Sequence, residues 1–141
     1  MGNGLCCLET VKPELVIAVE RFRRALEVGV LLHLVQFEAF PAGACGDTCL
    51  LLARWLEANG FGCWEYVTGW RDRWSLAWLQ QAGVIVDVTA DQFPDMKQPV
   101  IVSTDDAWHR HFNGQATKLE AFGPDDPLND AYAKLEEALS H

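Results

Sequence analysis

The chain has little positive charge: 11 Lys and Arg residues stand against 20 Asp and Glu in 141 residues, for a formal net charge of −9. Its largest basic cluster is the short stretch Arg21–Arg24. Proteins that bind nucleic acid need a basic face that neutralises phosphates. The composition therefore argues against a nucleic-acid partner. A protein or peptide partner is expected instead, and a basic or neutral one docks more easily on an acidic surface.

Long apolar runs and paired cysteines are also lacking. No run approaches the roughly 18 residues of a membrane-spanning helix, and no basic segment followed by an apolar stretch marks a signal peptide. The five cysteines form no even disulfide framework. We therefore expect a soluble, cytoplasmic protein with reduced thiols. No cofactor motif is present. Cys45 and Cys49 are four residues apart and far in sequence from His109 and His111, which is too weak a pattern to predict a zinc site.

The length and the 50% hydrophobic content suit one domain with a single core. We expect a flexible N-terminus over residues 1–11 and one domain over residues 12–141. The opening Met1–Cys7 places two cysteines after Gly2, as in lipidation signals, but position 6 lacks the preferred Ser or Thr. An unmodified, frayed terminus is the prediction, and lipidation at Gly2 is the alternative.

Hydrophobic spacing and turn residues predict an α+β fold. The stretch Val30–Val35 fits either a helix continuation or a buried strand. Elsewhere we expect helices over residues 13–28, 49–56, 105–112 and from 128 onward, strands over residues 64–69, 74–79, 84–88 and 100–102, and a loop over residues 113–123.

Cys45 lies in the turn-rich stretch Phe40–Thr48, directly before the apolar helical run Cys49–Leu56. Backbone N–H groups and the helix dipole favour a thiolate at a helix start. We therefore expect Cys45 to be a nucleophile site, with a pKa below that of a free cysteine. The alternative is that Cys45 is only a small buried apolar side chain.

The strands that follow predict a hairpin. A turn centred between Gln81 and Ala82 would pair residue 76 with Asp87 on one face of the sheet. Position 76 is thus where a histidine oriented by Asp87 would be expected, and Leu76 stands there. We expect Asp87 to be a buried carboxylate without a basic neighbour, so that Asp87→Asn costs no stability. Alternatively, Asp87 bonds the turn that begins at Thr89.

In this order, the segments resemble the transglutaminase-like branch of the papain-like cysteine enzymes. The family pattern is a cysteine at the start of a buried helix that ends in Gly, then Tyr-Val-x-Gly, His-Ala-Trp and Asp-x-Thr strands. The resemblance implies a Cys-His-Asp triad for acyl transfer or amide hydrolysis, on a Cys-bearing helix packed against a small antiparallel sheet with flanking terminal helices. Within residues 40–93 the pattern reads Cys45, Gly60, Tyr66–Gly69, Leu76–Trp78 and Asp87–Thr89.

The base position of this pattern holds Leu76, and leucine can neither take nor give a proton. General acid–base catalysis is typically worth about 10² to 10⁴-fold in rate. We therefore predict a degenerate, catalytically silent domain that binds a peptide or acyl-bearing partner. The alternative is an active thiol acyltransferase, deamidase or cysteine protease that uses His109 or His111, or in which Leu76 replaces a natural histidine. Both of these histidines are expected to be partly exposed helix residues.

Six tryptophans are an unusual number for this length, and most are expected to pack in the core. Trp70, Trp74 and Trp78 lie around the two strands next to the base position. They are the candidate substrate-binding or partner-binding residues.

Overall fold

The computed structural model describes residues 11–31, 33–34 and 37–140. The expectations for the N-terminus, including lipidation at Gly2, concern residues outside this part of the chain. Of the ambiguous stretch 30–35, the described residues lie in turns and a bend.

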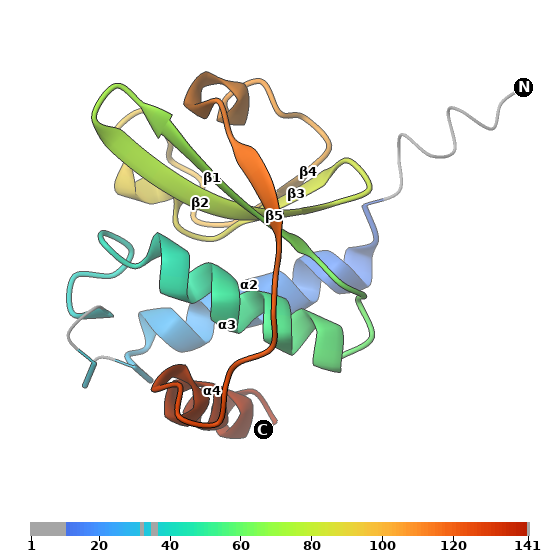
Figure 1. Ribbon diagram of the computed structural model, residues 1–141, viewed down its shortest axis with the longest axis vertical. Helices are drawn as coiled ribbons and strands as arrows, with labels where there is room; N and C mark the ends of the chain where they lie inside the picture. Colours follow the sequence, from blue (N-terminus) through green and yellow to red (C-terminus); the bar gives the residue numbers. More distant parts are fainter. Residues whose placement is uncertain (1–10, 32, 35–36, 141) are drawn as a thin grey trace, which may run out of the picture.

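Five strands form one antiparallel sheet in the order β4-β3-β2-β1-β5 (Figure 1). The four strands predicted from the hydrophobic pattern are present, with shifted ends. The fifth strand, β5, lies where a loop was expected. Its four residues are all exposed and show no apolar alternation, so the sequence pattern did not predict a strand there. The strands are β1 (Glu65–Arg71), β2 (Trp74–Gln81), β3 (Val84–Asp87), β4 (Ile101–Ser103) and β5 (Gln115–Lys118).

The α-helices lie on one side of this sheet, which confirms the α+β class. α3 (Cys45–Ala58) contacts β2, and α2 (Pro13–Glu27) contacts α3 and β4. α4 (Leu128–Leu139) packs on α2 and α3 on the side away from the sheet (Figure 1). None of the described helices is long and apolar enough to cross a membrane.

Side-chain alternation along the strands divides the buried residues between two faces. Ala77, Leu79 and Val86 point toward the helices and belong to the main core. The opposite face, called the outer face below, carries a second apolar cluster under the loops that follow β3 and β4. This outer cluster consists of Val67, Leu76, Trp78, Ile85, Phe93 and Phe112.

The β2–β3 hairpin is shifted by two residues from the expected register. Gln81 pairs with Val84 and Leu79 with Val86, so the turn is the two-residue loop Ala82–Gly83. Both turn residues have positive φ, 49° and 83°, as a type I′ hairpin turn requires. Continuing this register places Asp87 opposite Trp78 rather than opposite Leu76. Both side chains remain on the outer face.

A short 3-10 helix, η3 (His109–Phe112), lies against β1 on the outer face. It comes close because β1 carries Gly69 at the contact. A Cβ at this position would lie 2.3 Å from the backbone oxygen of Phe112, which is far too close for any side chain. Gly69 therefore sets how tightly η3 sits on the sheet.

The end of β3 is fixed from the helix side by a buried arginine. The Arg23 guanidinium of α2 donates to the carbonyl of Val88 at 2.7 Å, to the Asp91 carboxylate at 2.8 and 2.9 Å, and to the carbonyl of Pro99 at 3.1 Å. A buried guanidinium needs such partners to offset its lost hydration. This network holds the chain directly after Asp87.

Candidate functional site

Cys45 is the first residue of α3, so it lies in the first helical turn, whose N–H groups have no partner within the helix. The N–H groups of Cys45, Gly46 and Ala77 are placed to donate to its sulfur. Ala77 belongs to the part of β2 that precedes the pairing with β3, which begins at Leu79. The thiol is half-buried and contacts both the main core and the outer cluster.

The pKa of the Cys45 thiol is raised, not lowered, relative to free cysteine. Burial is the largest cause, and the negative charge of Asp87 adds to it; the N–H groups of Ala77 and Gly46 oppose them. The expectation of an activated thiolate is therefore wrong. A helix N-terminus favours the charged form, but here the apolar surroundings outweigh it.

Asp87 ends β3 and is 1% exposed, with both carboxylate oxygens engaged. Its Oδ2 lies 2.7 Å from Nε2 of His109, and its Oδ1 accepts the backbone N–H of Thr89 at 2.9 Å. The expectation that Asp87 stands without a basic neighbour is therefore wrong. Its alternative, a carboxylate that bonds the turn at Thr89, describes Oδ1 correctly.

His109 comes from η3 and is 3% exposed, whereas it was expected to be partly exposed. Its ring lies between two indoles, with centroids 4.8 Å from Trp78 and 5.0 Å from Trp108. His111, two residues on, is exposed. Of these two histidines, only His109 reaches the face that carries Asp87.

Leu76 is 1% exposed and lies in the outer cluster, against which Cys45 also packs. Among the described residues, no hydrogen bond joins the Cys45 thiol to a histidine ring. On this side the thiol packs against the apolar outer cluster, and His109 is hydrogen-bonded to Asp87.

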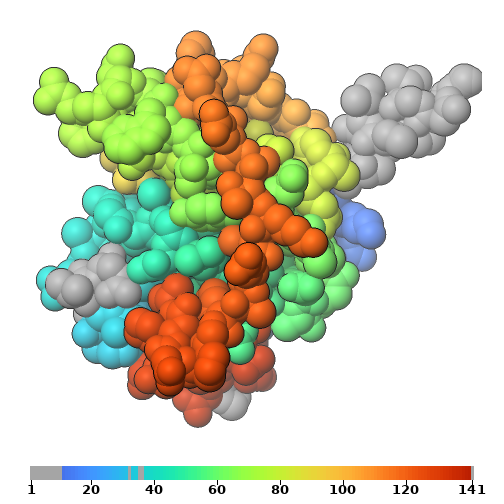
Figure 2. All heavy atoms as spheres, in the orientation of Figure 1, coloured from blue at the N-terminus to red at the C-terminus, as the bar shows by residue number. Residues whose placement is uncertain are grey.

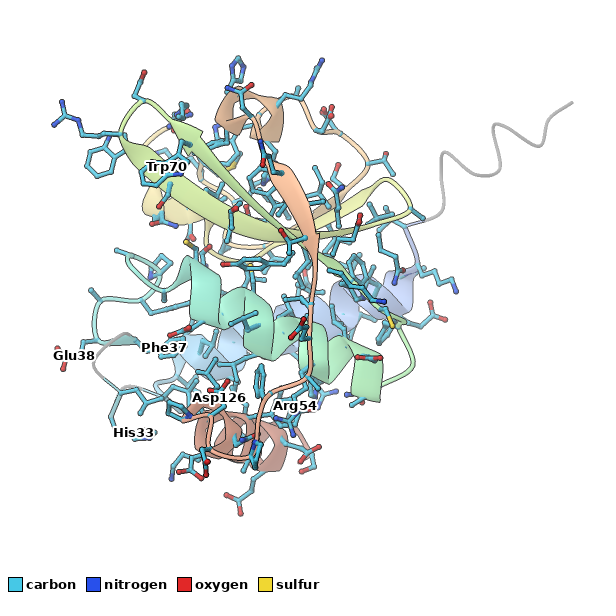
Figure 3. The ribbon with its side chains drawn as sticks, viewed as in Figure 1. His33, Phe37, Glu38, Arg54, Trp70 and Asp126 are labelled. Carbon is cyan, nitrogen blue, oxygen red and sulfur yellow. The ribbon has the colours of Figure 1, made fainter. Side chains whose placement is uncertain are left out.

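The three candidate binding tryptophans differ in position. Trp78 is 4% exposed and belongs to the outer cluster, whereas Trp70 and Trp74 are 62% and 59% exposed. Trp70 and Trp74 flank the turn of the β1–β2 hairpin, whose tip projects from the body of the molecule (Figure 2). Trp70 lies near this tip (Figure 3). Strand alternation turns Trp70 toward the helix side and Trp74 toward the outer face.

A network of polar and aromatic groups lies on the outer face around Trp108, next to His109. The Arg71 guanidinium donates to the Asp95 carboxylate at 2.8 and 3.1 Å, and the Trp108 indole N–H donates to the same carboxylate at 3.0 Å. The hydrogen bonds from Arg71 and Trp108 lower the pKa of Asp95 to about 2. The Arg71 guanidinium also lies over the rings of Phe93, Trp108 and Phe112. The network fixes Trp108 and, through it, His109.

Tyr66, which the sequence marked only as the start of the Tyr66–Gly69 motif, is a further residue of the Cys45 region. A Cβ added at Gly46 would lie 3.1 Å from the Tyr66 hydroxyl, so the hydroxyl reaches the first turn of α3. Burial, and then the nearby Cys49, Cys45 and Asp47, raise the pKa of Tyr66 to about 12. Alternation with buried Val67 was the only sequence signal that Tyr66 faces the helix.

Within residues 11–31, 33–34 and 37–140, no group of three or more His, Cys, Asp and Glu side chains is placed to hold a metal ion. Comparisons with protein-family models, with curated proteins and with solved structures found no match to the chain.

Proposed function

We propose that the chain is a transglutaminase-like domain with an incomplete triad, and that it binds a peptide or another acyl-bearing partner without chemistry at Cys45. The support for the transglutaminase-like family is the arrangement of Cys45 and Asp87 in the fold. Cys45 begins a helix that packs on a small antiparallel sheet, and Asp87 ends the strand next to the one that carries Leu76.

The observation that carries the proposal is the partner of Asp87. In a working triad, the carboxylate orients a histidine whose other nitrogen reaches the nucleophile. Here the carboxylate binds His109, and Cys45 packs against the apolar cluster to which Leu76 belongs. Without a hydrogen bond to a histidine among the described residues, and with a raised pKa, the Cys45 thiol stays mostly protonated at neutral pH.

The hairpin tip is the proposed contact surface. Tryptophan is enriched among the residues that dominate the binding energy of protein interfaces. Among the described residues, Trp70 and Trp74 are the aromatic side chains that stand out as large, exposed and apolar. Figure 1 shows the tip at the end of the molecule where α3 begins. A partner bound at Trp70 would thus extend toward Cys45.

One observation favours a second candidate function, a cysteine acyltransferase, deamidase or protease. The Asp87–His109 pair resembles the histidine–carboxylate couple of such enzymes, with the histidine on η3 instead of β2. In this version, His109 would serve as the base after a rearrangement that brings it to Cys45.

A capture experiment tests the first proposal. The wild-type chain, Cys45→Ala and Trp70→Ala/Trp74→Ala are each used as bait in a lysate of the native organism, with Ile17→Ala as an exposed apolar control. A partner kept by Cys45→Ala and the control but lost by the double variant supports a non-covalent module at the tip. A partner that needs Cys45, and stays bound through a bond cleaved by hydroxylamine, contradicts it.

A further inference from the structure

A pocket of about 380 Å³ opens on the outer face of the sheet, beside η3 and β5. Ligand sites commonly have volumes of about 300 to 1,000 Å³, so this pocket suits a molecule of fragment size. Val67, Trp78 and Ile85 form its apolar part, and Gln80 and Asn113 add side-chain amides. His109 also lines it.

The hydrogen bond to Asp87 decides which nitrogen of His109 is left as an acceptor. A carboxylate only accepts, so Nε2 carries the hydrogen in the 2.7 Å contact with Oδ2. In the neutral ring, Nδ1 is then a lone-pair acceptor. No hydrogen bond among the described residues uses Nδ1. The ring is 3% exposed and held between two indoles, so this acceptor is fixed in place.

A second buried polar group, on the lining residue Trp78, also lacks a partner. Trp78 is 4% exposed, and its indole Nε1 has no hydrogen-bond acceptor among the described residues. An unsatisfied buried donor is costly and is uncommon in folded proteins. With less than 1 Å² of accessible surface, this nitrogen does not open into the pocket, so Nδ1 of His109 is the unused polar group that the proposal relies on, beside the apolar lining.

We propose that this outer-face pocket is a ligand site separate from Cys45, and that it takes a small aromatic molecule bearing a hydroxyl group. The hydroxyl donates to Nδ1 of His109. The aromatic ring packs on Val67, Trp78 and Ile85. Asp87 positions the imidazole and touches no part of the ligand.

The test is a titration of the full chain, labelled with ¹⁵N-histidine, with phenol and with anisole, followed by NMR. Anisole has the same ring but no hydrogen to donate. The His109 signals are assigned with His109→Gln, and the spectrum itself shows when the ring is neutral. We expect phenol to move the Nδ1 resonance of His109 upfield in a saturable way, and to bind about five-fold more tightly than anisole, as one neutral hydrogen bond implies.

Two variants place the ligand and separate this proposal from the one about Cys45. Ala116 lines the pocket from exposed β5, so Ala116→Leu should fill the space and abolish the phenol shift while the fold stays intact. Cys45→Ala should bind phenol like the wild type, whether or not a partner binds at the hairpin tip. Equal binding of phenol and anisole, an unmoved Nδ1 signal, or full binding by Ala116→Leu would overturn the proposal.

Discussion

His109 and Asp87, 22 residues apart in sequence, form a buried pair in which Nε2 lies 2.7 Å from Oδ2. The pair joins η3 to the end of β3. In it, His109 binds the carboxylate that, by the family resemblance, would orient a catalytic histidine. The predictions below follow from this pairing and from the apolar surroundings of Cys45.

Asp87→Asn should destabilise the fold. The amide cannot accept from both Thr89 and His109 as the carboxylate does, and a buried group left unsatisfied costs about 1 to 3 kcal/mol. Urea denaturation at pH 7 measures the loss. Asp106→Asn, which removes the exposed ion pair with Arg110, serves as the control and should change stability by less than about 0.5 kcal/mol. Equal stability of Asp87→Asn and wild type would show that the pair contributes nothing.

Cys45 should react slowly with iodoacetamide at neutral pH. Because burial raises its pKa above that of free cysteine, the thiolate fraction at pH 7 is smaller than in a model thiol, and the rate should keep rising beyond the pH at which the model thiol levels off. The measurement uses a chain in which Cys6, Cys7, Cys49 and Cys63 are replaced by Ser. Labelling at pH 7 that is faster than that of the model thiol would mean that the N–H groups of the helix start outweigh burial.

Gly69→Ala should loosen η3. The added Cβ meets the Phe112 carbonyl, and overpacking of this kind costs about 1 to 3 kcal/mol. Gly123→Ala is the matched control, because a Cβ there has no heavy atom within 4 Å. Thermal denaturation of both variants decides the point, and a Gly69→Ala chain as stable as the control would place η3 farther from β1 than described.

Restoring a base at position 76 should require freeing Asp87 as well. In Leu76→His, the carboxylate is still held by His109 and Thr89, so the new ring lacks its orienting partner. In Leu76→His/His109→Phe, Oδ2 becomes available, and we expect Cys45-dependent thioester turnover to rise by about 10²-fold over wild type. Both variants are first checked for folding by circular dichroism. A folded double variant without any gain that depends on Cys45 would argue against the triad-like arrangement.

The sequence predicted the elements whose side chains follow a regular apolar period, such as α2, α3, α4 and the first strands. It missed β5, because Gln115–Lys118 is exposed throughout. The predicted position of the β2–β3 turn was also wrong, because alanine rarely adopts a positive φ and Ala82 therefore gave no sign of the turn. Because of this two-residue error, Asp87 was expected opposite position 76, whereas the observed register, when continued, places Thr89 there.

The Asp87–His109 contact could not be predicted from local patterns. η3 is too short to carry a period, and its position depends on Gly69 and on the hydrogen bonds among Arg71, Asp95 and Trp108. The one available signal was the spacing of Trp108 and Phe112 around His109, which is that of a buried face. The raised pKa of Cys45 was missed for a similar reason, since burial of the helix start depends on the whole sheet.

The acylation of Cys45 by 4-nitrophenyl acetate, measured against pH, tests whether the thiol works without a base. The wild type and His109→Gln are compared, and the Cys45→Ala rate is subtracted as background. If Cys45 has no base, both chains should give a single rise that follows ionisation of the thiol, with similar rates. A loss of about 10²-fold or more in His109→Gln, with a second titration below that of the thiol in the wild type alone, would make His109 the base and the chain an enzyme.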